Sequence, residues 1–115
     1  MQEPMKYNVI YTTQSRHDLD DIWDYIAFDL QNPTAAESTL DHIMDAVDQL
    51  NLFPESGAPL SSISDFAVYP DERFLVSGNY LVFYHTAHTD VFIDRVLYGG
   101  RDYLRILFRD AFPNE

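Results

Sequence analysis

The chain contains no cysteine, and its 115 residues include only four glycines and seven lysine or arginine side chains. Without cysteine, a disulfide framework, a thiolate metal site and a cysteine nucleophile are all excluded. No apolar run approaches the roughly 20 residues that a membrane span requires. The N-terminus also lacks the basic and apolar regions of a signal peptide. We therefore expect a cytoplasmic protein that does not enter a membrane.

Charge is distributed unevenly along the chain, which carries 19 acidic residues and a net charge of -12. This charge repels nucleic acid over most of the surface, because the phosphate contribution to affinity has the wrong sign there. It favours a basic partner instead. The basic side chains gather late in the sequence, as Arg73, Arg95, Arg101, Arg105 and Arg109. Any surface that handles anions is therefore expected in the C-terminal part.

The first half of the chain predicts one strand and two helices. Residues 6–12 are rich in aromatic and β-branched types, which favour a strand. Apolar residues of segments 19–30 and 36–50 recur at i, i+3, i+4 and i+7, the pattern of amphipathic helices. Asn32 is the expected cap of the second helix, with Pro33 at its first position. The two helices should form a hairpin.

Acidic side chains crowd the first predicted helix. Thr13 or Ser15 is the expected cap, which would place the acids of segment 18–24 in the first turns. Negative charge there is favourable because it meets the positive end of the helix dipole. We interpret this acidic face as solvated rather than as a cation site.

The second half of the chain predicts an antiparallel sheet. After a Pro-, Gly- and Ser-rich loop over residues 53–64, apolar runs at 73–77, 80–85 and 91–98 predict a three-stranded meander. Gly78-Asn79 suits a tight turn, whereas residues 86–90 predict a longer polar loop. The helical hairpin is the available cover for the meander, which makes the fold class α+β within a single domain, 1–115.

The segment beyond Gly99 and Gly100 predicts a short C-terminal helix. Its apolar positions have helical spacing, and Arg101, Arg105 and Arg109 fall in a row at i, i+4 and i+8. This row is either a solvated or internally paired face, or a functional basic surface. Residues 1–5 and 110–115 are expected to be flexible tails.

Few residues support catalysis or metal binding. His85 and His88 form the only close histidine pair, with Asp90 nearby, but zinc requires three or four rigid ligands and thiolates are absent. We therefore predict no metal and no cofactor. A phosphate-binding glycine loop and a Gly-x-Ser-x-Gly motif are also missing.

Metal-free RNA cleavage would need a base, an acid and a cation. Arg73 and Arg101 are the candidates for the cation, and His85 or Tyr103 for the proton carrier.

Four segments in order resemble the RelE/ParE superfamily of type II toxin-antitoxin toxins, over nearly the whole chain. Residues 20–27 (DDIWDYIA) are similar to the first-helix motif of ParE-like members, and residues 50–57 (LNLFPESG) to the exit from the second helix. Residues 79–84 (NYLVFY) and 95–102 (RVLYGGRD) are similar to two strand motifs. The resemblance implies a strand, a helical hairpin, a meander and an arginine-bearing tail.

The superfamily contains two mechanisms, and the resemblance is closer to the second. RelE-like members cut messenger RNA in the ribosome with clustered basic residues and a terminal tyrosine, whereas ParE-like members poison DNA gyrase. Here Leu81 stands where the nucleases carry arginine, and Leu107 where they carry tyrosine. The resemblance thus implies a growth-inhibiting, non-enzymatic gyrase inhibitor, with Arg95, Arg101 and Arg105 facing the target.

Two alternatives stay open beside this prediction. One is a metal-independent, ribosome-dependent endoribonuclease, and the other is an inactive relative that only binds antitoxin. In each case the resemblance implies a cognate antitoxin that wraps the toxin in a hetero-oligomer. That antitoxin is expected to offer basic residues to the acidic hairpin.

Overall fold

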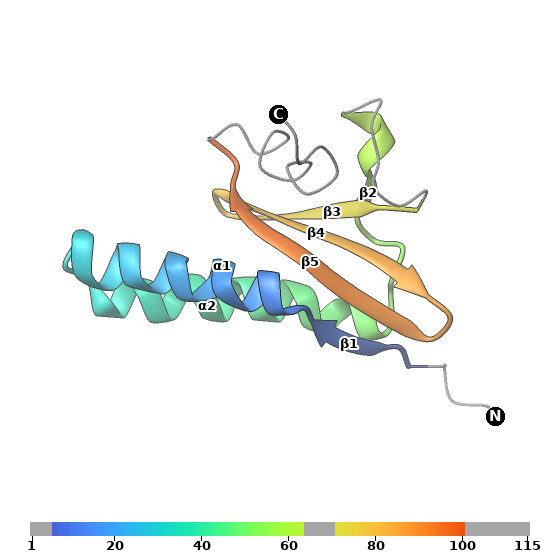
Figure 1. Ribbon diagram of the computed structural model, residues 1–115, viewed down its shortest axis with the longest axis horizontal. Helices are drawn as coiled ribbons and strands as arrows, with labels where there is room; N and C mark the ends of the chain where they lie inside the picture. Colours follow the sequence, from blue (N-terminus) through green and yellow to red (C-terminus); the bar gives the residue numbers. More distant parts are fainter. Residues whose placement is uncertain (1–5, 64–70, 101–115) are drawn as a thin grey trace.

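The computed structural model describes residues 6–63 and 71–100, and it has the expected α+β architecture. Two helices cover one face of a five-stranded sheet with the strand order β1-β5-β4-β3-β2 (Figure 1). The elements are β1 Asn8–Tyr11, α1 Thr13–Asp24, α2 Pro33–Asp48, β2 Ala58–Pro59, β3 Arg73–Ser77, β4 Tyr80–Ala87 and β5 Asp90–Tyr98. The predicted C-terminal helix and both predicted tails lie outside the described residues.

The meander is confirmed: β3, β4 and β5 pair antiparallel in chain order. Strand β1 joins it in parallel beside β5, and the short strand β2 pairs with β3 on the opposite edge. The turn at Gly78 has φ 58, a left-handed conformation that glycine adopts without steric cost. The predicted polar loop over residues 86–90 is wrong. Strand β4 continues to Ala87, which pairs with Asp90, and His88 completes a tight turn with φ 58.

Helix α1 begins earlier than the sequence predicted. Its N-cap is Thr12, whose side-chain oxygen accepts a hydrogen bond from the Ser15 N–H, so neither Thr13 nor Ser15 is the cap. The first turn therefore contains no acidic residue, and the aspartates of segment 18–24 occupy the later turns. The predicted match between these charges and the helix dipole is wrong for that reason.

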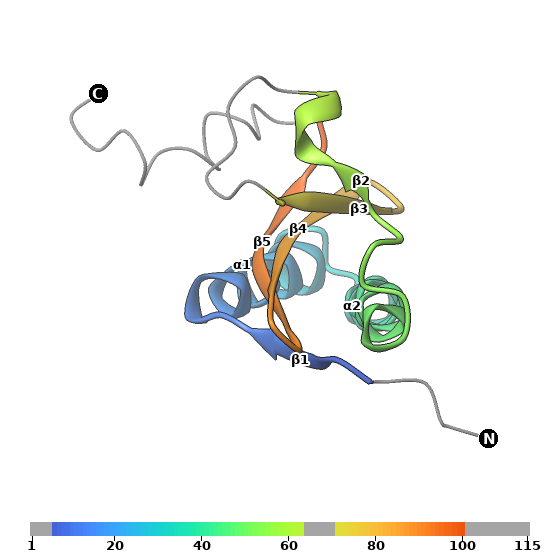
Figure 2. The same cartoon turned by 90° about the vertical axis from the view of Figure 1, so that its right-hand side faces the viewer.

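Helix α2 follows the prediction closely. The Asn32 side chain accepts a hydrogen bond from the Ala35 N–H, and Pro33 occupies the first helical position. The helix passes into a 3-10 turn, Gln49–Asn51, shortly before Pro54. Between the helices, a π-helical turn at Tyr25–Asp29 ends α1. The view in Figure 2 shows α1 and α2 side by side against the twisting strands β4 and β5.

The main core lies between the helical hairpin and the sheet. Its fully buried members include Ala36, Ile43, Val47, Leu50, Val82, Tyr84, Val91 and Ile93. Three positions of the predicted helical stripes are instead substantially exposed: Trp23, Leu30 and Met44. A second cluster on the other sheet face joins Leu60, Leu81, Phe83 and Leu97. Leu60 comes from a 3-10 turn, Leu60–Ser62, within the segment that was predicted to be only loop.

Tyr84 fastens the loop after α2 to the sheet. Its buried hydroxyl donates to the Pro54 carbonyl and accepts from the Gly57 N–H, both at 2.9 Å. The Arg73 guanidinium donates to the Gly57 carbonyl at 2.8 Å. A Cβ at Gly57 would lie 2.6 Å from the Tyr84 hydroxyl, so only glycine fits this close approach.

Candidate functional site

Strand β5 contains a bulge immediately before its arginine. Phe83 pairs with Arg95 and Tyr84 pairs with Ile93, which leaves Asp94 as the additional residue on β5. A bulge re-aims the side chains that follow it and increases the local twist. It thereby sets the direction of β5 as the strand approaches its glycine-containing end.

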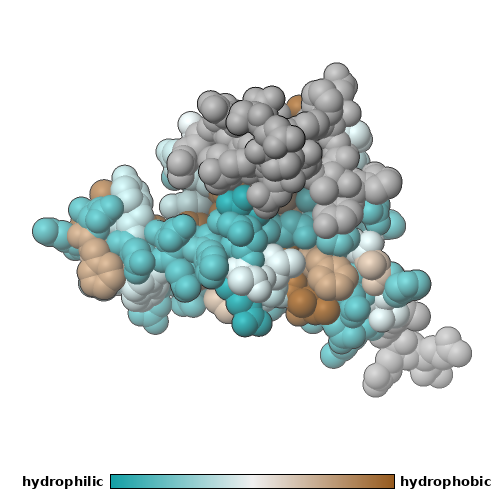
Figure 3. All heavy atoms as spheres, in the orientation of Figure 1, coloured by the Kyte–Doolittle hydropathy of each residue, from teal (hydrophilic) through white to brown (hydrophobic). Residues whose placement is uncertain are grey.

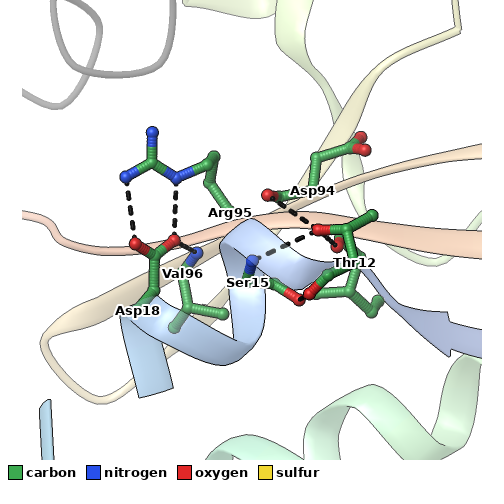
Figure 4. Close-up of polar contacts among 7 residues, drawn as sticks. Thr12, Ser15, Asp18, Asp94, Arg95 and Val96 are labelled. Carbon is green, nitrogen blue, oxygen red and sulfur yellow. Dashed lines mark hydrogen bonds and ion pairs between the residues drawn. The ribbon is translucent and has the colours of Figure 1, made fainter. Parts of the chain in front are cut away.

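The Arg95 side chain is held by α1. Its Nε and one terminal nitrogen donate to the two carboxylate oxygens of Asp18, at 2.8 and 2.9 Å (Figure 4). The Val96 N–H donates to the same carboxylate at 2.9 Å. The side chains of Arg95 and Asp18 are mostly buried, with 12% and 7% of their surfaces exposed. The pairing between β1 and β5 ends at Tyr11, and beyond it the Asp18 carboxylate accepts the hydrogen bond of a β5 backbone N–H.

Thr12 makes a second connection to the bulge. Its hydroxyl donates to the Ile93 carbonyl at 2.8 Å, and the same oxygen accepts from the Ser15 N–H at the start of α1 (Figure 4). The Ser15 hydroxyl in turn donates to the Thr12 carbonyl. Helix α1 is therefore connected to β5 on both sides of the bulge residue Asp94. Thr12, its N-cap, bonds Ile93 before the bulge, and Asp18 bonds Arg95 after it.

The end of β5 is packed by tyrosines and closed by two glycines. The rings of Tyr80 and Tyr98 meet edge to face, with centroids 5.8 Å apart. Gly99 donates its N–H to the Asn79 carbonyl at 2.8 Å. A Cβ at Gly100 would lie 2.5 Å from the Tyr98 ring, so a larger residue would displace that ring. The strand therefore has a defined end, after which the arginine-rich segment begins.

The residues predicted to face a target divide into two groups. Arg95 is paired with Asp18, so this aspartate is buried and does not belong to the solvated acidic face that the sequence predicts. Arg101 and Arg105 lie outside the described residues. Target binding by all three stays a prediction, and the geometry gives Arg95 the additional role of anchoring β5 to α1.

The candidate nuclease residues are not brought together within the described part of the chain. Arg73 pairs with Tyr84 in the sheet, and its guanidinium lies on the side of the Gly57 loop. His85 follows Tyr84 and projects to the opposite face, because successive strand side chains alternate. There it contacts Asp94, at 2.6 Å. The other two candidates, Arg101 and Tyr103, lie outside the described residues.

The helical hairpin presents a mixed acidic and aromatic surface. Exposed acids on its two helices and the turn between them are Asp20, Asp21, Asp24, Asp29, Glu37, Asp41, Asp45 and Asp48. At the end of the hairpin Tyr25, Phe28 and Leu30 are 53%, 69% and 55% exposed. Hydrophobic side chains show at that end among hydrophilic ones (Figure 3). Such a patch on an otherwise charged surface is typical of a protein interface.

Comparison with known proteins identifies the architecture. The family described as ParE toxin of type II toxin-antitoxin system, parDE, matches residues 9–103, which include the hairpin, the meander and the arginine-bearing end of β5. The chain belongs to the ParE toxin family. A toxin of this kind of system has an antitoxin as its partner. No curated protein matches the sequence significantly.

A solved structure shows the same fold as this ParE-family chain. It comes from the chromosomal ParDE toxin-antitoxin system of P. aeruginosa, with a TM-score of 0.66 and 20% sequence identity. The match covers 84% of this chain and 98% of that chain. None of the helices that the structure describes is long and apolar enough to span a membrane.

Proposed function

We propose that this ParE-family toxin arrests DNA gyrase without enzymatic activity of its own. The family match over residues 9–103 is the observation that carries the proposal. The strand geometry supports it, because Arg73 and His85 project from opposite faces of the sheet and contact different partners. Leu81 and Leu107 replace two basic or hydroxyl-bearing positions of the nuclease pattern. A gyrase target also implies action in the cytoplasm.

Arg101 and Arg105 form the proposed target-facing surface. They follow the glycine-terminated end of β5, in the one part of a strongly acidic chain where arginine is concentrated. Arginine suits an anionic or carboxylate-bearing target because its guanidinium offers several donors in a fixed plane. Arg95 contributes by anchoring β5, the strand that precedes this segment in the sequence, to α1 through its contact with Asp18.

The test is the order in which synthesis fails after the toxin is induced without antitoxin. DNA and protein synthesis are followed by pulse labelling within minutes of induction. The gyrase proposal predicts that DNA synthesis fails first. Protein synthesis failing first, with cleavage inside translated codons, would instead support the endoribonuclease. Growth without any defect would identify an inactive, antitoxin-binding relative.

We further propose that the antitoxin covers the helical hairpin with basic and apolar side chains. The exposed acids along α1 and α2 favour a positively charged segment, and Phe28 with Leu30 offers apolar contact at the hairpin end. The pair Glu37→Lys and Asp41→Lys should weaken antitoxin binding more in low salt than in high salt. An acidic toxin-binding segment in the antitoxin would contradict this proposal.

A further inference from the structure

Three ligand-type side chains converge on the sheet face opposite the helices. Glu72 directly precedes β3, His85 lies in β4, and Asp94 is the bulge residue of β5. One ligand atom from each lies within 4.8 Å of the other two. Two of them come from neighbouring strands and the third from the residue before β3, and the bulge places Asp94 beside His85. Phe92 stacks on the imidazole, with centroids 5.2 Å apart and an interplanar angle of 18°, which fixes the ring.

Glu72 is the unusual member of this cluster. It is only 3% exposed, and its Oε2 has no hydrogen-bond partner within the part of the chain that the structure describes. The His85 Nδ1 lies 3.8 Å from this oxygen, and it is already in contact with Asp94 at 2.6 Å. A buried carboxylate is costly unless it is paired or coordinates a metal. Among residues 6–63 and 71–100, the buried Oε2 of Glu72 therefore lacks the hydrogen bond that a charged carboxylate would need.

The electrostatics of the two carboxyl groups agree with this geometry. Burial, and then the nearby charge of Asp94, raises the pKa of Glu72 to about 10. Burial likewise raises the pKa of Asp94, although contact with His85 opposes that effect. At neutral pH Glu72 therefore keeps its proton, which a bound metal ion would have to displace.

We propose that Glu72, His85 and Asp94 form a binding site for a divalent transition-metal ion of the Zn²⁺ type. Metal binding would release the proton of Glu72, and the resulting two carboxylates and neutral imidazole carry the charge that one divalent ion cancels. Ligand atoms at about 2.0–2.2 Å from tetrahedral zinc lie roughly 3.3 Å apart. To reach this spacing, the distance between His85 and Asp94 must increase from 2.6 Å by less than about 1 Å. The distance between Glu72 and His85 must decrease from 3.8 Å by less than about 1 Å.

The ligand types determine the class of metal. An imidazole ligand favours zinc, copper, iron or nickel, whereas Mg²⁺ and Ca²⁺ prefer ligand sets made of oxygen alone. Three protein ligands leave a position for water. His88, which pairs with His85 in the sequence, is exposed and is not part of the cluster. The site joins β3, β4 and β5, so its occupation stabilises the sheet, independently of any gyrase activity.

The first test is thermal unfolding with and without Zn²⁺. At a free concentration about 100-fold above the dissociation constant, Zn²⁺ should raise the Tm of the unchanged protein by roughly 10 °C. His88→Ala is the matched control, since it removes an exposed imidazole three residues from His85 in the sequence, and it should keep the full shift. Glu72→Gln should lose most of it. An equal shift in Glu72→Gln and the unchanged protein would overturn the proposal.

The second test needs no variant and therefore holds even if Glu72→Gln does not fold. One equivalent of Zn²⁺ is added to the unchanged protein, and the imidazole nitrogens of the four histidines are followed by two-dimensional NMR. The His85 Nδ1 resonance should move to the position of a metal-bound nitrogen, whereas those of His17, His42 and His88 should not. Absence of any His85 response, or a response confined to the exposed histidines, would refute the site.

Discussion

Arg95 in the last strand forms a two-point ion pair with Asp18 in the first helix, and the contact joins segments that are 77 residues apart. The same carboxylate accepts the Val96 N–H. One aspartate therefore neutralises the arginine and satisfies the sheet edge where β1 has ended. The position of β5 against α1, close to the end of the strand at Tyr98, depends on this contact.

Arg95→Met should destabilise the fold by about 3–5 kcal/mol, because it leaves the Asp18 charge buried without its partner. Urea unfolding measures this loss. Arg16→Met is the matched control, since Arg16 is an exposed arginine on α1 and its loss should cost within about 0.5 kcal/mol. Equal stability of the two variants would contradict the anchoring role of Arg95.

Asp18→Ala should cost more stability than Asp18→Asn. The asparagine side chain keeps one carbonyl oxygen for the Val96 N–H, whereas alanine leaves that donor without a partner. Amide hydrogen exchange checks this directly. The Val96 amide should exchange much faster in Asp18→Ala than in Asp18→Asn, and equal protection in both variants would show that the carboxylate does not hold the strand edge.

Two tyrosine hydroxyls should respond in opposite ways to removal. Tyr84→Phe leaves the Gly57 N–H and the Pro54 carbonyl unsatisfied and should cost about 1–3 kcal/mol. The Tyr11 hydroxyl is buried without a partner among the described residues, so Tyr11→Phe should be neutral or stabilising. Denaturant unfolding of both variants compares them. A larger loss for Tyr11→Phe would be inconsistent with this packing.

Stability should also decline at alkaline pH. Burial, and then the charge of Asp48, raises the pKa of Tyr11 to about 12 in the folded protein. Because this pKa exceeds the value of about 10 in the unfolded chain, the folded protein holds the Tyr11 proton more tightly than the unfolded chain does. The stability that this proton contributes is complete below about pH 10 and is lost as the pH rises towards 12. Tyr11→Phe should therefore show a shallower decline over this range in urea unfolding. Parallel pH profiles for the two proteins would rule out this contribution.

Much of the architecture was predictable because it depends on local patterns. The Asn32-Pro33 start of α2, the three strand cores and the Gly78 turn follow from residue type and spacing. The start of α1 was not, because Thr12, Thr13 and Ser15 are all plausible caps. Thr12 takes that position, where its hydroxyl also bonds the Ile93 carbonyl of a distant strand.

The long-range contacts were the part that the sequence could not supply. Asp18 resembles its acidic neighbours on α1, and only its place beside β5 makes it a buried partner of Arg95. The Asp94 bulge has no local signal in the sequence, yet it brings Asp94 to His85 and Glu72. Close spacing in the sequence indicates His85 with His88 instead, whereas strand pairing assembles this cluster from residues far apart in the chain.

The most direct measurement of the central claim uses purified toxin and purified DNA gyrase in a supercoiling assay. The account predicts that the toxin inhibits supercoiling, that Arg101→Ala with Arg105→Ala abolishes inhibition while the fold survives, and that Arg16→Ala leaves it unchanged. Normal supercoiling in the presence of folded, unmodified toxin would contradict the account.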